Sequence, residues 1–232
     1  MQKEIELYYW PTPNGWKISI ALEELSLPYK VKLVNINEGD QKKQIYKEKL
    51  PFGKIPSIID FDKFGNKILI CESGNILIYL ATKTKKLYGI TAMDKMKINQ
   101  WVFWQVSSLG PMAGQAHHFI KYAPNFSTPI ILPYAQKRYQ KQVTILYKIL
   151  EKNLDENEYI AGDFFSIADV SILPWIAQWK DQKQNIDNFK NLKKWFLKCC
   201  ERPMVKKGFQ LHSDLRYQKV DKDKSEKLLF NI

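Results

Sequence analysis

The sequence is short of cysteine and histidine and has no long hydrophobic run. It contains three cysteines and three histidines, none of them in a CxxC pair or in the spacing of a metal site. A disulfide framework, a redox dithiol and a bound metal are therefore not expected. No segment approaches the roughly 18 apolar residues that a membrane helix requires, and no apolar leader follows Met1. We expect a soluble, cytoplasmic protein with no membrane partner.

Arginine is also scarce, although the chain is basic. The 36 basic and 24 acidic residues give a net charge of +12, yet only Arg138, Arg202 and Arg216 are arginines. Residues 1–86 hold 14 basic and 10 acidic residues, a net +4, and the rest of the chain carries the other +8. Phosphate and base-edge recognition favours arginine, and no nucleic-acid motif is present. The excess is better interpreted as a solvated lysine surface, with no nucleic-acid partner.

Apolar material, by contrast, is plentiful, and it follows two different patterns. Hydrophobic residues make up 45% of the 232 residues, a length that suits two domains of about 100 to 150 residues each. The pattern up to residue 86 mixes strands with helices, and the pattern from residue 92 onward is that of amphipathic helices alone. The sequence therefore predicts an α/β domain followed by an all-α domain.

The first domain is expected to be thioredoxin-like, over residues 1–86. Strand-like segments occur at 5–10, 29–34, 57–59 and 68–70. Helices are expected after the first and fourth strands, with Asn14 and Ser73 as their N-caps. The β-α-β start implies a parallel strand pair, and Pro56 stands directly before the third strand. This order and this proline are typical of the thioredoxin-like fold.

The second domain is expected to contain four or five helices over residues 92–210. The proline-rich segment 123–129 interrupts them. Ser166 and Asp169 form an SxxD capping box before an apolar run. Residues 211–232 are charged and weakly periodic, so we expect a partly mobile tail. Cys199 and Cys200 are neighbours on a helix, and only one of them is expected to join the core.

The turn after the first strand contains no sulfur. Redox members of the thioredoxin-like fold carry CxxC there, whereas this chain reads Thr12-Pro13-Asn14-Gly15. Any thiol chemistry must therefore use the thiol of a bound molecule. Glutathione, a thiol tripeptide with two carboxylates and one ammonium group, is the obvious carrier.

Six motifs support this interpretation. They are PTPNGWK at 11–17, KIPSI at 54–58, ESGNILIYL at 72–80, WVFWQVSSLGPMAGQAHHF at 101–119, PYAQKRYQ at 133–140 and SIAD at 166–169. Together they resemble the cytosolic glutathione transferases, most of all the Nu class of glutathione-dependent disulfide reductases and a related fungal nitrogen-regulation protein. ESG and SxxD are general to the superfamily, whereas PTPNG with GPMxGQxHHF is specific to the Nu-like branch.

The resemblance implies a thioredoxin-like domain followed by an all-helical transferase domain, with glutathione as co-substrate. It implies that Thr12 and Asn14 stabilise the glutathione thiolate. The backbone at a cis Ile55-Pro56 junction would face the cysteinyl part of the ligand. These three contacts would hold the reacting end of glutathione.

The other implied contacts hold its charged ends. Ser73 begins a helix whose first N–H groups attract an anion, so the γ-glutamyl carboxylate fits there and Glu72 can pair with the neighbouring ammonium. Gln41 and Lys54 match positions that face the glycyl carboxylate. Arg138 matches a contact to a glutathione carboxylate, at the domain cleft or in a second bound molecule.

Several alternatives remain open at the residue level. Tyr8 or Tyr9, at the end of the first strand, could activate the thiol as in tyrosine-type transferases. Ser73 could only cap its helix, Lys54 could be an ordinary surface residue, and Arg138 could form an interhelical salt bridge.

The favoured activity is reduction of a small disulfide by glutathione, in a homodimer. Conjugation of glutathione to electrophiles is the alternative within the same enzyme class, and the helix with Trp101, Phe103 and Trp104 could line its apolar pocket. A non-catalytic, glutathione-binding regulatory role is the alternative from another class. Removal of all three cysteines is expected to leave disulfide turnover largely intact.

Overall fold

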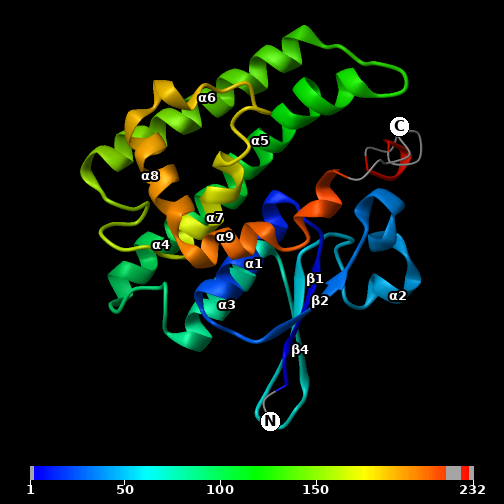
Figure 1. The fold of residues 1–232 in the computed structure, drawn as a ribbon, viewed down its shortest axis with the longest axis vertical. Coiled ribbons are helices and arrows are strands. Elements are labelled where there is room, and N and C mark those ends of the chain that lie inside the picture. The colour runs from blue at the N-terminus through cyan, green and yellow to red at the C-terminus, as the bar shows by residue number, and fades with distance from the viewer. Residues whose placement is uncertain (1–2, 218–225, 230–232) are drawn as a thin grey trace. The chain divides into compact units, whose positions relative to one another are not determined.

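The computed structural model describes residues 3–217 and 226–229, which fold into two compact units (Figure 1). The first unit holds the described residues of Met1–Thr84 and Met204–Ile232, and the second is Lys85–Pro203. The first contains the β-sheet and the second is helical, which confirms the predicted fold class. The C-terminal segment from Met204 thus belongs to the same compact unit as the sheet.

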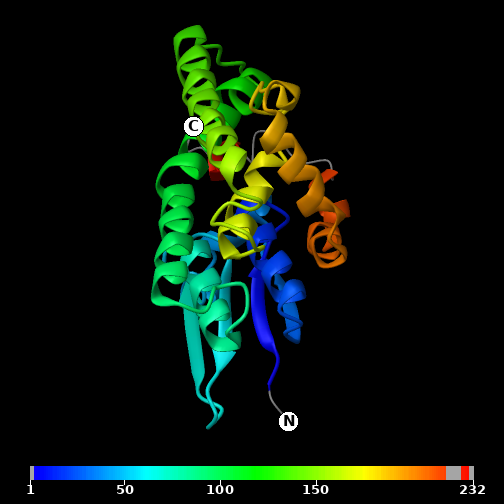
Figure 2. The same cartoon turned by 90° about the vertical axis from the view of Figure 1, so that its left-hand side faces the viewer.

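The sheet of the first unit has four strands. They are β1 (Ile5–Tyr9), β2 (Tyr29–Leu33), β3 (Ser57–Phe61) and β4 (Lys67–Cys71). Their order is β2-β1-β3-β4, in which β1 is parallel to β2 and antiparallel to β3, and β3 is antiparallel to β4. The parallel β1–β2 pair confirms the predicted β-α-β unit. Figure 2 shows the β3–β4 hairpin, in cyan, ending in its turn.

Three α-helices precede the second unit: α1 (Pro13–Glu24), α2 (Gln44–Lys47) and α3 (Ser73–Thr84). In Figure 1, α1 and α3 lie together on one side of the strands and α2 lies on the other. The expected N-caps were wrong for both longer helices. Thr12, not Asn14, caps α1, because Pro13 suits the first helical position and lacks the N–H that would need a partner. Ser73 is the first residue of α3 rather than its cap.

α1 is buried on nearly all sides, from Gly15 to Glu23. It packs against α3 and against α9 (Pro203–Gln210) of the C-terminal segment. The Ser19 hydroxyl donates a hydrogen bond to the Gly208 carbonyl at 2.8 Å. Position 208 must be glycine, because a Cβ there would lie 2.6 Å from the Cα of Ile20. This close approach fastens the C-terminal segment to α1.

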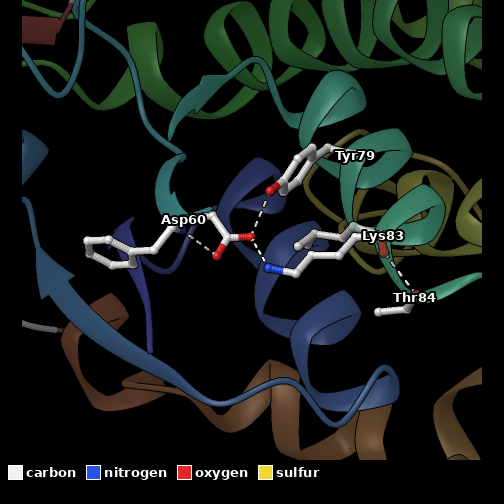
Figure 3. A network of polar contacts seen from close by, with 6 residues as sticks. Asp60, Tyr79, Lys83 and Thr84 are labelled. Carbon is white, nitrogen blue, oxygen red and sulfur yellow. Dashed lines mark hydrogen bonds and ion pairs between the residues drawn. The ribbon is translucent and has the colours of Figure 1, made fainter. Parts of the chain in front are cut away.

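A buried carboxylate joins β3 to α3 (Figure 3). Asp60 on β3 is 1% exposed. Its Oδ2 accepts a hydrogen bond from the Tyr79 hydroxyl at 2.8 Å and pairs with the Lys83 ammonium. Both partners lie on α3, one turn apart. The network therefore fixes the position of α3 along the sheet.

The second unit contains α4 (Ala92–Trp104), α5 (Gly110–His117), α6 (Pro133–Glu156), α7 (Ile167–Ile176) and α8 (Lys190–Glu201). With α9 there are six α-helices between residues 92 and 210, whereas the sequence predicted four or five. Two of the six, α5 and α9, have only eight residues each, so their sequence patterns are short. π-helical turns at Gln105–Leu109 and His118–Tyr122 flank α5. Among the described residues, no helix is long and apolar enough to cross a membrane.

The predicted capping box is present at the start of α7. The Ser166 hydroxyl accepts from the Ala168 N–H at 3.2 Å, and the Asp169 carboxylate accepts from the Ser166 N–H at 2.9 Å. Asp169 also accepts from the Trp195 indole at 2.8 Å. Ser166 and Asp169 therefore have a structural role. Cys199 is buried and Cys200 only partly so, as expected for helix neighbours.

Half of the tail that was expected to be mobile, residues 218–225 and 230–232, lies outside the described residues. The part of the tail that is described begins with a 3-10 helix, Ser213–Tyr217. There the Arg216 guanidinium lies 4.5 Å from the centre of the Trp16 ring. Arg216 therefore contacts α1.

Candidate functional site

Three connections of the first unit meet at one end of the sheet. Tyr8 of β1 lies opposite Ser57 of β3, and Ser57 lies opposite Cys71 of β4. The turn after β1, the residues before β3 and the residues after β4 therefore adjoin one another. These connections carry most of the predicted site residues, at positions 12–14, 54–56 and 72–73.

Thr12 occupies the N-cap position of α1 and is partly exposed. Its Oγ1 accepts a hydrogen bond from the Gly15 N–H at 3.1 Å. A hydroxyl has one proton to donate and two lone pairs to accept with. Capping therefore leaves the Thr12 proton available to an acceptor outside the helix, such as a thiolate.

The rest of the corner places polar groups at the positive end of α1. Asn14 lies in the first turn and is partly exposed. Gly15 allows the chain to fold back tightly, because a Cβ at that position would lie 2.2 Å from the Trp10 carbonyl oxygen. The helix N-terminus carries a partial positive charge. The corner thus offers donors and positive potential to an anion.

The two tyrosines of β1 are poorly placed to activate a thiol. The Tyr8 hydroxyl donates to the Glu6 carboxylate at 3.2 Å, and burial, with Glu6, raises the pKa of Tyr8 to about 12. Tyr9 is 0% exposed, donates to the Leu211 carbonyl at 3.1 Å, and has a pKa raised by burial. Neither phenol proton is directed at the corner, which favours Thr12 and Asn14 as the thiolate ligands.

The junction between β4 and α3 forms the second part of the site. Glu72 is exposed and has a left-handed backbone, with φ of 65°. Ser73 is buried at the first position of α3. The first N–H groups of a helix have no partner within it and attract anions. The arrangement suits a ligand end that carries a carboxylate beside an ammonium group.

Lys17 is a residue of this junction that the sequence did not predict. It is 1% exposed, and its Nζ donates to the Ser73 Oγ at 3.2 Å. Burial lowers the pKa of the Lys17 ammonium to about 7, an effect partly opposed by Glu72. The signal in the sequence was its position inside the apolar run of α1, since a lysine there is buried and must find a partner.

The third part of the site precedes β3. The Ile55–Pro56 peptide bond is cis, as the resemblance implies. Lys54 is exposed. Gln41 lies in the 3-10 helix Asp40–Lys42 and is buried, and its Oε1 has no hydrogen-bond partner in the described part of the chain. A ligand donor near Gln41 would satisfy this oxygen.

Arg138 belongs to the second unit, unlike the other predicted site residues. It lies on α6 and is exposed. A cavity of about 250 Å³ is lined by Tyr134, Lys137, Arg138, Lys141 and Gln142. Three of the five lining residues are cationic, and all five lie on α6.

Cys71 and Cys199 do not have the properties of reactive thiols. Burial, with a smaller effect of Glu72, raises the pKa of Cys71. Burial also raises the pKa of Cys199. A nucleophilic cysteine instead needs a lowered pKa. In the described residues there is also no group of three or more His, Cys, Asp or Glu side chains that could hold a metal.

Comparison with known proteins places this chain within a family. The N-terminal domain of glutathione S-transferase matches residues 12–83, and its C-terminal domain matches residues 122–203. The chain belongs to the glutathione S-transferase family. It is 38% identical to the disulfide-bond oxidoreductase YfcG of Escherichia coli, over 86% of this chain and 91% of that protein. It is 32% identical to the disulfide-bond oxidoreductase YghU of the same organism, over 88% and 73%.

Solved structures of the family show the same fold. A glutathione transferase family member from Pseudomonas fluorescens, with two glutathione molecules bound, has a TM-score of 0.81 and 34% identity, over 89% of this chain and 92% of that one. A glutathione transferase from Pseudomonas putida, with one glutathione disulfide bound per subunit, has a TM-score of 0.83 and 30% identity, over 90% and 92%.

Proposed function

We propose that this chain is a glutathione-dependent disulfide reductase in which the reactive sulfur belongs to bound glutathione. The observation that carries the proposal is the Thr12 hydroxyl, which caps α1 and keeps its own proton for an acceptor. The raised pKa values of Cys71 and Cys199 support a borrowed thiol. Two relatives named disulfide-bond oxidoreductase and a neighbour with bound glutathione disulfide support the reaction class.

Each part of glutathione has a proposed set of contacts. Thr12 and Asn14 hold the thiolate, and the backbone of Ile55, before Pro56, meets the cysteinyl residue. Ser73 and the start of α3 hold the γ-glutamyl carboxylate, with Glu72 near the ammonium group. Gln41 and Lys54 face the glycyl carboxylate. These contacts all come from the proposed glutathione-binding domain, residues 1–86.

The chemistry consists of two thiol–disulfide exchanges. The thiolate of bound glutathione attacks one sulfur of the substrate disulfide, the S–S bond breaks, and the second sulfur leaves as a thiolate that takes up a proton. The thiolate of a second glutathione then attacks the glutathionyl sulfur of the mixed disulfide. The products are glutathione disulfide and two thiols, and no cysteine of the protein changes its redox state.

Arg138 is proposed to bind a carboxylate of glutathione, in the helical domain of residues 92–210. It lines the cavity on α6 beside Lys137 and Lys141, whose charges attract an anion. Arginine binds carboxylates in a planar, two-pronged geometry that lysine cannot copy. Arg138→Lys, which keeps the charge, is therefore a suitable test of this contact.

The proposal is tested by comparing two reactions of the purified protein. Oxidation of glutathione by bis(2-hydroxyethyl) disulfide reports reduction, and conjugation of glutathione to 1-chloro-2,4-dinitrobenzene reports transfer to an electrophile. We expect turnover with the disulfide to dominate. Dominant conjugation would favour the transferase alternative, and binding of glutathione without either turnover would favour the regulatory one.

A cysteine-free variant tests the source of the sulfur. Cys71→Ser, Cys199→Ala and Cys200→Ser are combined, with alanine at the buried position to avoid an unpartnered hydroxyl. Disulfide turnover is expected to stay within about threefold of the wild type, since the pKa values of Cys71 and Cys199 are raised and the proposed reactive sulfur belongs to glutathione. Loss of turnover in a variant with an unchanged circular dichroism spectrum would overturn the mechanism.

We also propose that the protein is a homodimer, as the family resemblance implies. Large apolar side chains are exposed in both units, among them Phe52 at 64%, Met96 at 64% and Phe103 at 59%. Sedimentation equilibrium should give twice the 27.4 kDa mass of the chain. A monomeric mass at micromolar concentration would contradict this assembly.

A further inference from the structure

Lys17 is a buried cation that the proposed chemistry does not use. Its side chain is 1% exposed, in the middle of an apolar helix. Lysine is almost never fully buried without a partner, because removal of the ammonium group from water is unfavourable. A leucine or methionine would fill the same space at lower cost. The presence of a lysine therefore calls for an explanation beyond packing.

The donor–acceptor direction of the Lys17 hydrogen bond provides such an explanation. An ammonium group has three protons to donate and no lone pair, whereas a hydroxyl has one proton and two lone pairs. In the 3.2 Å contact between Lys17 Nζ and Ser73 Oγ, a protonated Lys17 must donate and Ser73 must accept. The proton of Ser73 is then directed away from Lys17. Ser73 is thereby kept as a donor toward its other neighbours.

We propose that Lys17 is a positioning residue for the anion at the start of α3. It holds the Ser73 hydroxyl in the donor role, so that this end of the site selects a carboxylate. The inference rests on the proposed function, in which that carboxylate is the γ-glutamyl group of glutathione. Lys17 acts through Ser73 and does not itself react.

The charged groups around Lys17 are compatible with this role. Glu72, at the junction before α3, is the carboxylate that interacts with Lys17. Several other charged or titratable groups on the elements that contact α1 have partners elsewhere: Lys83 pairs with Asp60, Lys207 with Glu23, the Tyr79 hydroxyl with Asp60, the Tyr9 hydroxyl with Leu211, and Arg216 with the Trp16 ring. Glu72 is exposed and remains accessible to the ammonium group of a ligand.

The test measures binding of S-methylglutathione, which keeps both carboxylates but has no thiol to titrate. Calorimetric titrations compare the wild type with Lys17→Met, Ser73→Ala and the double variant. We expect each single substitution to weaken binding by roughly tenfold or more, as for the loss of a charge-assisted hydrogen bond. The double variant should bind S-methylglutathione with about the same affinity as the single variant that binds less tightly, because Lys17 acts through Ser73.

Ser19→Ala is the matched control on the same helix. Ser19 is buried like Lys17, but its hydroxyl donates to Gly208 and not to the junction. This variant should lose stability and keep its affinity for S-methylglutathione. A similar loss of affinity in Ser19→Ala would assign the effect of Lys17→Met to general disturbance of α1, and so overturn the proposal.

The pH profile of the wild type gives a second readout. Because the pKa of Lys17 is lowered to about 7, the affinity for S-methylglutathione should fall as the pH rises from about 6 to about 8. Lys17→Met should show a flat profile over this range. A wild-type affinity that rises over this range would contradict the proposal, even if Lys17→Met failed to fold.

The outcomes separate this inference from the proposed function. If the wild type ignores S-methylglutathione at every pH, the proposed function itself fails. If the wild type binds it, and Lys17→Met binds it equally well with the same pH profile, the function stands and the role of Lys17 is rejected. Additive effects of Lys17→Met and Ser73→Ala would also reject it.

Discussion

At the scale of single residues, the main feature is that one hydroxyl can serve both the fold and the ligand. Thr12 accepts the Gly15 N–H and so caps α1. The same oxygen has a proton for the proposed thiolate. A substitution at position 12 is therefore expected to affect stability and turnover by separable amounts, depending on whether the new side chain accepts, donates or does both.

Three substitutions at Thr12 separate the two roles. Thr12→Val removes both, and should lower the free energy of unfolding by about 1 kcal/mol and disulfide turnover by roughly tenfold or more. Thr12→Asp should keep the cap but lose turnover, because a carboxylate caps helices well yet has no proton and repels a thiolate. Thr12→Ser should keep both the helix cap and the disulfide turnover. Urea unfolding and glutathione oxidation measure the two effects.

The three variants are informative as a set. If Thr12→Asp turned over disulfide at the wild-type rate, the hydroxyl proton would have no part in catalysis. If Thr12→Val lost turnover and stability in parallel, while Thr12→Asp recovered both, the residue would act only as a cap.

Residue identities are also where sequence reasoning was least complete. Thr12 and Asn14 were both recognised, but the N-cap was assigned to Asn14 because either side chain can cap a helix. Pro13 between them was the deciding signal, since proline favours the first helical position. Lys17 was missed as a site residue, because its contact with Ser73 joins positions 56 residues apart. No local pattern encodes such a pair.

At the scale of elements, α3 is the helix on which the site depends. Its first residue, Ser73, contacts α1 through Lys17, and Tyr79 and Lys83 further along bind Asp60 of β3. These contacts come from two different elements, so they fix both ends of the helix. The strands, α1 and α3 were predictable from local periodicity, whereas this cross-linking was not, since it depends on which faces meet after folding.

Substitutions in the Asp60 network should destabilise the first unit. Tyr79→Phe removes one hydrogen bond to a buried carboxylate, and should lower the free energy of unfolding by roughly 1 to 2 kcal/mol. Lys83→Met removes the partner charge and should cost more, on the order of 2 to 3 kcal/mol, because Asp60 stays buried while Lys83 is partly exposed. Urea unfolding curves measure the free energy of unfolding of each variant.

Asp60→Leu combined with Lys83→Met provides the control. Removal of both charges leaves no uncompensated carboxylate, so the double variant should be more stable than Lys83→Met alone. If Lys83→Met instead unfolds at the wild-type urea concentration, the ion pair contributes nothing, and the position of α3 is set by packing.

At the scale of the whole molecule, the chain folds into two units, and the first of them draws on both ends of the sequence. Periodicity predicted where strands give way to helices. It could not predict that residues from Met204 belong with the sheet, because the contacts of Gly208 with Ile20 and Ser19 join residues nearly 190 positions apart. The composition of the last helix resembles that of the helices before it, so no local signal marks the change.

Buried titratable groups in both units should make stability depend on pH. Burial lowers the pKa of Lys17 to about 7 and lowers that of His118. The unfolded chain binds more protons than the folded one above these lowered values, so stability rises with pH there. Burial raises the pKa of Cys71 and Cys199. The unfolded thiols lose protons first, so the contribution of these two thiols to stability falls at higher pH and opposes that of Lys17.

The free energy of unfolding should therefore increase from about pH 6 to about pH 8, by on the order of 1 kcal/mol. Urea unfolding at these two pH values measures the increase. Lys17→Met removes the penalty of a buried charge, so it should gain stability at pH 6 relative to the wild type and show a smaller rise toward pH 8, with the remainder due to His118. An equal rise in Lys17→Met would mean that the Lys17 ammonium stays protonated in the folded protein through this range. In that case a charged lysine would stand behind Ser73 at every pH where the proposed enzyme works.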